Sequence, residues 1–371
     1  MSPEPAGRRT TPLAAKLAAR IRREGPISVA DYMRACLSDP EHGYYRKRAA
    51  IGRDGDFITA PEISQVFGEL IGLWCAVVWR SLGAPSHVRL VELGPGRGTL
   101  MRDALRAARA DPAFHSALDV RLVETNETLE SLQRASLSGE AVPVRWSADM
   151  AWAERPVASI VIANEFLDTH PVAQWVSRDG RWHRRCVGLD ETGSLCFTMG
   201  EADASVIAPG QDGDILESRT EALAPWADKL VACGDPLAVL FIDYGHPRPA
   251  LGDTLQAVVA HRYDDPLRAP GEADLSAQVD FAEVAEVMRR RGLACDGPVS
   301  QAHFLSALGI VERTSRLMAA NPLRAAVIEA GAARLLAPTG MGTRFCALGV
   351  RSKSVAPLPG FEPVDIARSA P

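Results

Sequence analysis

Residues 91–100 read VELGPGRGTL, and this stretch decides the fold. The apolar run 87–93 before it predicts a buried strand, and residues 99–110 predict a helix. The two are separated by Gly94, Gly96 and Gly98. Glycine adopts positive φ without strain and lets a ligand approach the backbone, and α/β sheets bind ligands at the carboxyl ends of their strands. We therefore expect a cofactor loop at this turn.

Two cofactors compete for this loop. A dinucleotide fingerprint has the spacing G-x-G-x-x-G, whereas this chain has G-x-G-x-G, with Thr99 in place of the last glycine. Pro95 removes an amide that could face a pyrophosphate. Glu92 lies just before the glycines, where a carboxylate suits the sulfonium and amino acid end of S-adenosylmethionine. The pattern favours S-adenosylmethionine, with S-adenosylhomocysteine as product, over NAD, and a tight turn without a ligand is the structural alternative.

Apolar runs of strand length recur after this loop. They cover residues 119–125, 142–146, 158–164, 237–245 and 343–350. Helical stretches alternate with them, and the fourth strand, 158–164, is apolar throughout, as in a parallel strand buried on both faces. The fold class is therefore α/β, with a Rossmann-like methyltransferase sheet that is mostly parallel and has an antiparallel last strand.

The chain divides into four expected regions. Residues 1–85 form an N-terminal helical cap, and residues 86–351 form the methyltransferase core. Residues 174–235 are a β-rich insertion beside the site, with Asp179-Gly180 at a hairpin turn. Residues 352–371 contain four prolines and are expected to be a loose tail.

A helix start precedes the sheet. Thr59 is suited to the N-cap, Pro61 to the first turn, and Glu62 to the third helical position. Apolar residues then follow at helical spacing as far as Gly83, which predicts one long helix.

Composition and charge limit which partners and which cellular location we expect. The net charge of −5 predicts no nucleic-acid partner, and the longest apolar run, 70–79, is about half of the ~20 residues that cross a bilayer, so we expect no membrane insertion. The seven cysteines are scattered without zinc spacing, which predicts free thiols and no metal. The arginine-rich N-terminus could be a mitochondrial transit segment, but Glu4 and the lack of serines beyond Ser2 favour an ordinary first helix. We expect a cytoplasmic protein, and composition leaves its oligomeric state open.

Polar residues follow the second and third strands. Glu124 ends the second strand, where a carboxylate can accept the hydroxyls of an adenosine ribose. Asp149 and Met150 follow the third, where they could contact the adenine amino group and ring. A solvated strand end and an ordinary polar loop are the respective alternatives.

Acidic residues gather after the fourth strand. Asn164, Glu165 and Asp168 lie in the sequence ANEFLDTHP, where they should face the transferable methyl group. A carboxylate pair suits a cationic guanidinium and can accept its proton, so these three are the expected catalytic residues. His170 follows in the same stretch, and it could bind substrate or simply bind local backbone.

The fifth strand ends in a second polar group. Asp243 and His246 lie in the sequence IDYGH, and we expect them to contact the substrate, although a structural role is the alternative.

These motifs together resemble the MidA-like methyltransferases, which are related to a mitochondrial complex I assembly factor that methylates an arginine. The resemblance rests most on GDFITAPEISQVFGE and ANEFLDTHPV and extends from about residue 12 to residue 351. It implies a class I S-adenosylmethionine fold, a protein substrate such as a respiratory complex I subunit, and transfer to a guanidinium. It also implies that Asp56, Thr59, Pro61, Glu62 and Ser64 pack over the cofactor. One departure is Ser276-Ala277-Gln278, where the family pattern leads us to expect Thr-Ala-His.

Three functions therefore remain open. The first is a protein arginine N-methyltransferase. The second is a methyltransferase acting on a small molecule. The third is an assembly factor that binds S-adenosylmethionine without turnover, and an NAD oxidoreductase is a distant fourth.

Overall fold

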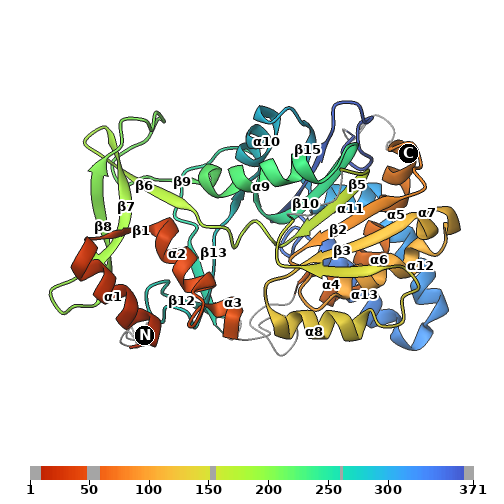
Figure 1. The fold of residues 1–371 in the computed structure, drawn as a ribbon, viewed down its shortest axis with the longest axis horizontal. Helices are drawn as coiled ribbons and strands as arrows, with labels where there is room; N and C mark the ends of the chain where they lie inside the picture. The colour runs from red at the N-terminus through yellow and green to blue at the C-terminus, as the bar shows by residue number, and fades with distance from the viewer. Residues whose placement is uncertain (1–9, 48–58, 151–155, 260–261, 363–371) are drawn as a thin grey trace.

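The computed structural model describes residues 10–47, 59–150, 156–259 and 262–362. In Figure 1 a large sheet flanked by helices lies on the right and a smaller β-rich part on the left. The helices of the described chain are α1 (Pro12–Glu24), α2 (Val29–Ser38), α3 (Tyr44–Lys47), α4 (Ala60–Ile63), α5 (Gln65–Ser81), α6 (Thr99–Ala108), α7 (Pro112–Ala117), α8 (Glu127–Ser136), α9 (Thr220–Cys233), α10 (Phe281–Arg290), α11 (Gln301–Ala307), α12 (Ile310–Ala320) and α13 (Ala325–Leu336), with a 3₁₀ turn at Pro322–Arg324.

The large sheet has the strand order β15-β16-β10-β5-β2-β3-β4. These strands are β2 (Val88–Leu93), β3 (Leu118–Val123), β4 (Val144–Ser147), β5 (Ser159–Asn164), β10 (Leu237–His246), β15 (Ala294–Ser300) and β16 (Phe345–Arg351), with the short β14 (Val279–Asp280) beside the end of β10. The five strands from β10 to β4 are parallel, and β16 is antiparallel to β10. The expected mostly parallel sheet with an antiparallel last strand is confirmed.

Strand β15 has no counterpart in the sequence prediction. Its sequence, ACDGPVS, has no apolar run, and its pairing with β16 is interrupted by a register shift between Asp296 and Val299. It lies at the edge of the sheet, where glycine and proline are tolerated.

Both faces of the sheet are covered, since its central strands carry apolar side chains on either side. Leu90 and Ile162 pack on the face covered by α5 and α6, whereas Leu93 and Val161 pack on the face covered by α9 and α10. The two helices of the first face approach closely at Gly72, where a Cβ would lie 2.3 Å from the carbonyl oxygen of Ala104. The carboxyl ends of five parallel strands are therefore held at one rigid edge.

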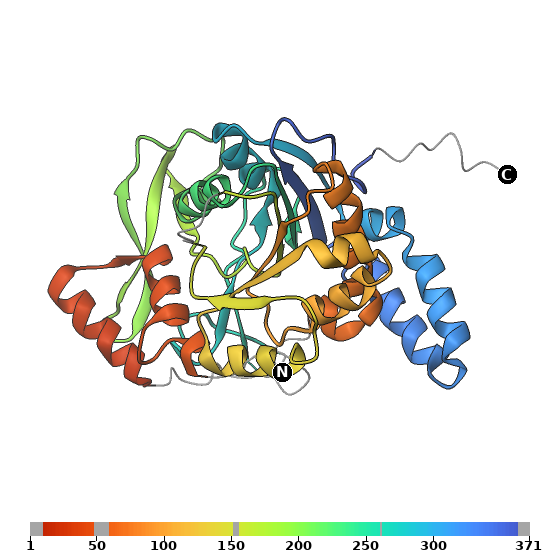
Figure 2. The same cartoon turned by 45° about the vertical axis from the view of Figure 1, so that its right-hand side comes forward.

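A second part is built from the insertion together with the N-terminus. Its strands are β1 (Ile27–Ser28), β6 (Ala173–Arg178), β7 (Arg181–Leu189), β8 (Leu195–Ala202) and β9 (Ile215–Ser218), and a three-stranded sheet is formed by β11 (Gln256–Val259), β12 (Arg262–Asp264) and β13 (Asp274–Ser276). Asp179 and Gly180 have φ of 52° and 69°, as the predicted hairpin turn requires. Helices α1 and α2 share one apolar cluster with β7 and β13. In Figure 2 they lie at the opposite end of the molecule from α12 and α13.

The region boundaries expected from the sequence do not coincide with the apolar clusters of the structure. Helix α5, placed in the cap, belongs to the core of the large sheet, and α9, placed in the insertion, covers its other face. The predicted single helix from Thr59 to Gly83 is also wrong. Ser64 is extended, with φ −152° and ψ 126°, and its hydroxyl accepts the N–H of Val66, so a new helix begins there. Thr59 makes no side-chain hydrogen bond to α4.

The expected loose tail is wrong over residues 352–362. Val355 and Leu358 are buried in the main core, and Phe361 stacks near Phe304 with ring centroids 5.1 Å apart. The indole N–H of Trp74 donates to the carbonyl of Pro359 at 3.0 Å. These contacts hold the segment against α5 and α11, and residues 363–371 lie outside the described chain.

Candidate cofactor and methyl-transfer site

The glycine loop has the backbone that its sequence requires. Gly94, Gly96 and Gly98 have φ of 62°, 55° and 76°, a region that L side chains rarely adopt. The N–H of Gly98 donates to the carbonyl of Pro95 at 2.8 Å and closes the turn at the start of α6. A Cβ on Gly94 would lie 3.0 Å from the ring of Phe166. The loop is therefore tight and leaves its backbone open to a ligand.

Two buried acceptors face a narrow cavity beside this loop. Glu92 is 3% exposed and Asn164 is 8% exposed, and within the described chain Glu92 Oε2 and Asn164 Oδ1 have no hydrogen-bond donor. Both residues line a cavity of about 40 Å³ together with Thr59, Pro61, Glu62, Gly94, Pro95, Gly96 and Glu165. Buried acceptors without a donor are costly. They fit a ligand that brings N–H donors and positive charge, as the ammonium group of S-adenosylmethionine does.

Burial also changes the ionisation of Glu92. Desolvation raises its pKa to about 8, although the backbone N–H of Met101 opposes the shift. A bound cation would reverse this effect because it favours the carboxylate.

Glu124 lies on the other side of the loop. Its Oε1 accepts the N–H groups of Thr125 and Asn126, each at 2.8 Å, and its Oε2 accepts from Gln133 Nε2 at 3.0 Å. Burial raises its pKa, and these hydrogen bonds oppose the shift. The sequence analysis missed Gln133, although it follows Leu129 by four residues on the buried face of α8.

A larger cavity of about 400 Å³ extends from Glu124 and the glycine loop to the N-terminal helices. Its aromatic wall consists of Phe166, His170 and Trp226, whose ring centroids are 4.6–5.6 Å apart. Burial lowers the pKa of His170 to about 4, so its ring is neutral, and its Nδ1 lies 2.8 Å from the carbonyl oxygen of Phe166. Tyr45 and Trp226 also line this cavity and were not predicted, and Trp226 comes from α9, far from the sequence motifs.

Glu165 lies where the two cavities meet. Its φ is 51°, and its Oε1 accepts the N–H of Ala60 at 2.9 Å and the amide N–H of Asn164 at 3.1 Å. Desolvation raises its pKa to about 7, and the nearby Asp243 adds to the shift. A carboxyl with this pKa can accept a proton near neutral pH.

Asp168 lies in the same loop, with Oδ1 buried and without a donor in the described chain. Burial raises its pKa well above the usual value, and the carboxylates of Asp243 and Asp274 raise it further. A bound cationic group would lower this pKa, because it favours the carboxylate form of Asp168.

Asp243 has a different role from the one expected. Its Oδ2 accepts the N–H groups of Phe166, Leu167 and Asp168, and its Oδ1 accepts the N–H of Tyr244. It therefore holds the loop that follows β5 and does not present its carboxylate to a substrate.

The linings of the two cavities do not include Asp168, and they do not include three other expected site residues. His246 is turned to the carbonyl of Arg248 on the surface, because β10 continues beyond Asp243. Asp149 pairs with Lys229 at 2.7 Å, and Met150 is buried in the apolar cluster below α9. Of the Ala148–Met150 segment only Ala148 lines the larger cavity.

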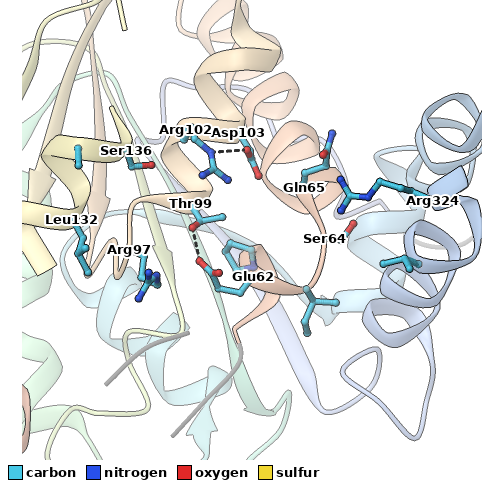
Figure 3. Close-up of a pocket in the computed structure, with 14 residues that line it drawn as sticks. Glu62, Ser64, Gln65, Arg97, Thr99, Arg102, Asp103, Leu132, Ser136 and Arg324 are labelled. Carbon is cyan, nitrogen blue, oxygen red and sulfur yellow. Dashed lines mark hydrogen bonds and ion pairs between the residues drawn. The ribbon is translucent and has the colours of Figure 1, made fainter. Parts of the chain in front are cut away.

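Figure 3 shows a third cavity, of about 540 Å³, on the outer side of α4. The carboxylate of Glu62 accepts the hydroxyl of Thr99 at its inner wall, and Arg102 pairs with Asp103 at 3.2 Å. Glu62 thereby links α4 to the start of α6 and holds the segment above the glycine loop. In the described segments there is no group of three potential metal ligands and no helix long and apolar enough to cross a membrane.

The fold and the site define a methyltransferase class, with a glycine loop and buried acceptors at the carboxyl edge of a parallel sheet. The model of a family described as S-adenosyl-L-methionine-dependent methyltransferases matches residues 70–299. The chain belongs to this family, and S-adenosylmethionine is its cofactor.

Individual relatives agree with this assignment. The protein arginine methyltransferase NDUFAF7 homolog, mitochondrial, of Drosophila melanogaster is 36% identical over 370 residues, which cover 90% of this chain and 83% of the relative. The human protein arginine methyltransferase NDUFAF7, mitochondrial, is 33% identical over 374 residues, covering 92% and 84%. A crystal structure from Burkholderia thailandensis, bound to S-adenosyl-homocysteine, is 27% identical with a TM-score of 0.84, and the match covers 96% of this chain and 97% of that one. The resemblance noted from the motifs is confirmed.

The comparison corrects one prediction. The expected cytoplasmic location is contradicted, because the relatives are named as mitochondrial proteins. Charge and serine content near the N-terminus were too weak a basis for that prediction.

Proposed function

We propose that this methyltransferase transfers a methyl group to an arginine guanidinium of a protein. The observation that carries the proposal is the pair Glu165 and Asp168, two carboxyl groups in one loop beside the glycine turn. The names of the relatives, which are protein arginine methyltransferases, support the acceptor class. The motif resemblance extends this proposal to a subunit of respiratory complex I as the target.

The proposed cofactor contacts divide between the two cavities. Glu92 and Asn164 bind the ammonium end, and the backbone of Gly94, Gly96 and Gly98 lies along the ligand. Glu124 accepts from the ribose, while Thr59, Pro61 and Glu62 cover the narrow cavity. When bound, S-adenosylmethionine supplies a methyl group on a positively charged sulfur.

Glu165 and Asp168 act on the acceptor. The guanidinium favours the carboxylate forms of both groups, and these hold it and orient one nitrogen for in-line attack. As the new carbon–nitrogen bond forms and the carbon–sulfur bond breaks, that nitrogen loses a proton, which Glu165 accepts. Asn164 orients Glu165 through its amide N–H. Residues of α2 and α3 line the larger cavity, and so does His170 from the loop after β5.

The substitution Glu165→Gln tests the proposal. The purified enzyme is incubated with labelled S-adenosylmethionine and with extract from cells lacking the gene, and hydrolysed protein is assayed for methylarginine. Wild type should label arginine, whereas Glu165→Gln should lose at least about 100-fold in rate while binding S-adenosylhomocysteine normally. His246→Gln is the control, because His246 lies outside the cavities. Unchanged labelling by Glu165→Gln, or label only in small molecules, contradicts the proposal.

A further inference from the structure

Gln133 connects the two halves of the cofactor site without lining either cavity. It is fully buried on α8, and its Nε2 donates to the carbonyl of Gly96 at 2.8 Å and to Glu124 Oε2 at 3.0 Å. One side-chain amide therefore ties the glycine loop after β2 to the carboxylate after β3.

The orientation of this amide is fixed by a third contact. The indole N–H of Trp146 donates to Gln133 Oε1 at 2.9 Å. A flipped amide would place its NH₂ against that N–H and its oxygen against two acceptors, so only the present orientation satisfies all partners.

The hydrogen bonds to Glu124 leave little acceptor capacity. A carboxylate has about four lone-pair sites. Thr125 and Asn126 occupy two on Oε1, and Gln133 occupies one on Oε2. About one site remains, on the oxygen that Gln133 holds, and Glu124 lines the larger cavity.

We propose that Gln133 is a positioning residue that orients Glu124 so that it accepts from a single ribose hydroxyl of the cofactor. This inference rests on the proposed ribose role of Glu124. It goes further in two ways: it assigns a residue that does not touch the cofactor, and it replaces recognition of both hydroxyls by recognition of one.

The test measures binding of S-adenosylhomocysteine and of its 2′-deoxy and 3′-deoxy analogues by calorimetry. For wild type, loss of one hydroxyl should weaken binding roughly 10- to 100-fold, as for hydrogen bonds to charged groups, and loss of the other should have less than about a 3-fold effect. Gln133→Met should weaken binding of S-adenosylhomocysteine about 10-fold and remove most of the discrimination between the analogues.

Controls separate positioning from folding. Gln301→Met is matched, because Gln301 is also fully buried and donates to a backbone carbonyl, that of Leu335, but lies away from the site. It should lower the melting temperature and keep the discrimination. Trp146→Phe removes the donor to Gln133 Oε1 and keeps an aromatic ring beneath Arg134. It should reduce the discrimination partially, which keeps the test informative if Gln133→Met does not fold.

The outcomes are distinct. If Gln133→Met, or Trp146→Phe in its place, discriminates between the analogues as wild type does, the positioning role is overturned. If wild type loses more than about 10-fold with each analogue, recognition of a single hydroxyl is overturned. If wild type binds S-adenosylhomocysteine tightly but ignores both hydroxyls, the ribose role of Glu124 fails, and the inference fails with it. Lack of any binding would refute the cofactor site itself.

Discussion

The backbone N–H of Leu167 donates to Asp243 Oδ2 at 2.8 Å, which joins the loop after β5 to the end of β10. Phe166 and Asp168 donate to the same oxygen. The residues proposed to hold the methyl acceptor are therefore oriented by a carboxylate from the neighbouring strand. Without it, three N–H groups of the loop would lack their acceptor.

We expect Asp243→Ala to destabilise the protein by about 3 kcal/mol, since buried donors without acceptors cost about 1–3 kcal/mol each and the loop can relax. Transfer activity should fall in parallel. Urea denaturation measures the stability change. Asp228→Ala is the control, because the Asp228 side chain is 66% exposed and pairs with Arg291 on the surface, so its removal should cost less than about 0.5 kcal/mol. Equal stability of the two variants would contradict the role of Asp243.

Cofactor affinity should depend on pH through Glu92. Its pKa in the folded protein is about 8, against 4.5 as the ordinary value, so between these limits the folded protein holds a proton that the unfolded chain has lost. Protonated Glu92 therefore stabilises the ligand-free folded protein relative to the unfolded chain at low pH, and this stabilisation is lost as pH rises through about 8. A cationic ligand favours the carboxylate, so affinity for S-adenosylhomocysteine should rise with pH, by at most about tenfold per unit, and level off above the pKa.

Calorimetry at several pH values measures this dependence, and buffers of different ionisation enthalpy reveal the released proton. Glu92→Gln should bind more weakly and should lose most of the pH dependence. If the affinity of Glu92→Gln for S-adenosylhomocysteine still rises with pH as in wild type, another group is responsible for the effect.

The rate of transfer should rise with pH through Glu165. Because its pKa is about 7, only part of Glu165 is in the proton-accepting carboxylate form below neutral pH. We expect kcat/KM, which reports the free enzyme, to rise about tenfold per pH unit below about 7 and to level off above it. His170 has a pKa of about 4 and is therefore already neutral in this pH range, so its titration cannot produce the rise in rate. A rise that remains in Glu165→Gln would exclude Glu165 as the base.

Gly94→Ala should block the cofactor site. The φ of 62° disfavours any L side chain, and the added Cβ would press on the ring of Phe166 at 3.0 Å. Strain of about 1–2 kcal/mol and displacement of the loop should lower affinity for S-adenosylhomocysteine at least about tenfold. Gly139→Ala is the control, because no atom lies within 4 Å of its added Cβ and its φ is outside the left-handed region. Normal binding by Gly94→Ala would show that the loop tolerates a side chain.

Much of the sheet could be predicted because β2, β3, β5 and β10 are short stretches rich in Val, Ile and Leu with polar residues at or near their carboxyl ends. The glycine loop and Glu165 followed from the same pattern. By contrast, β15 has no apolar signal, and the break at Ser64 depends on a local hydrogen bond that competes with the helix.

Site residues were predictable where a strand end fixed their place. Gln133 and Trp226 reach the site from helices, through tertiary packing that no local spacing encodes. Asp243 was predicted at the right edge but with the wrong role, because three of its backbone partners belong to the loop after the neighbouring strand β5. His246 was misplaced because β10 carries it past that edge.

The position of β16 has a consequence for biosynthesis. This strand is formed by residues 345–351, later in the chain than every other strand of the sheet, yet it lies inside the sheet between β10 and β15. Before residues 345–351 have been synthesised, β10 lacks its antiparallel neighbour β16. Asp243 then lies in a strand with one unpaired edge. A complete edge at β10 therefore requires residues 345–351 to have been synthesised and to have docked.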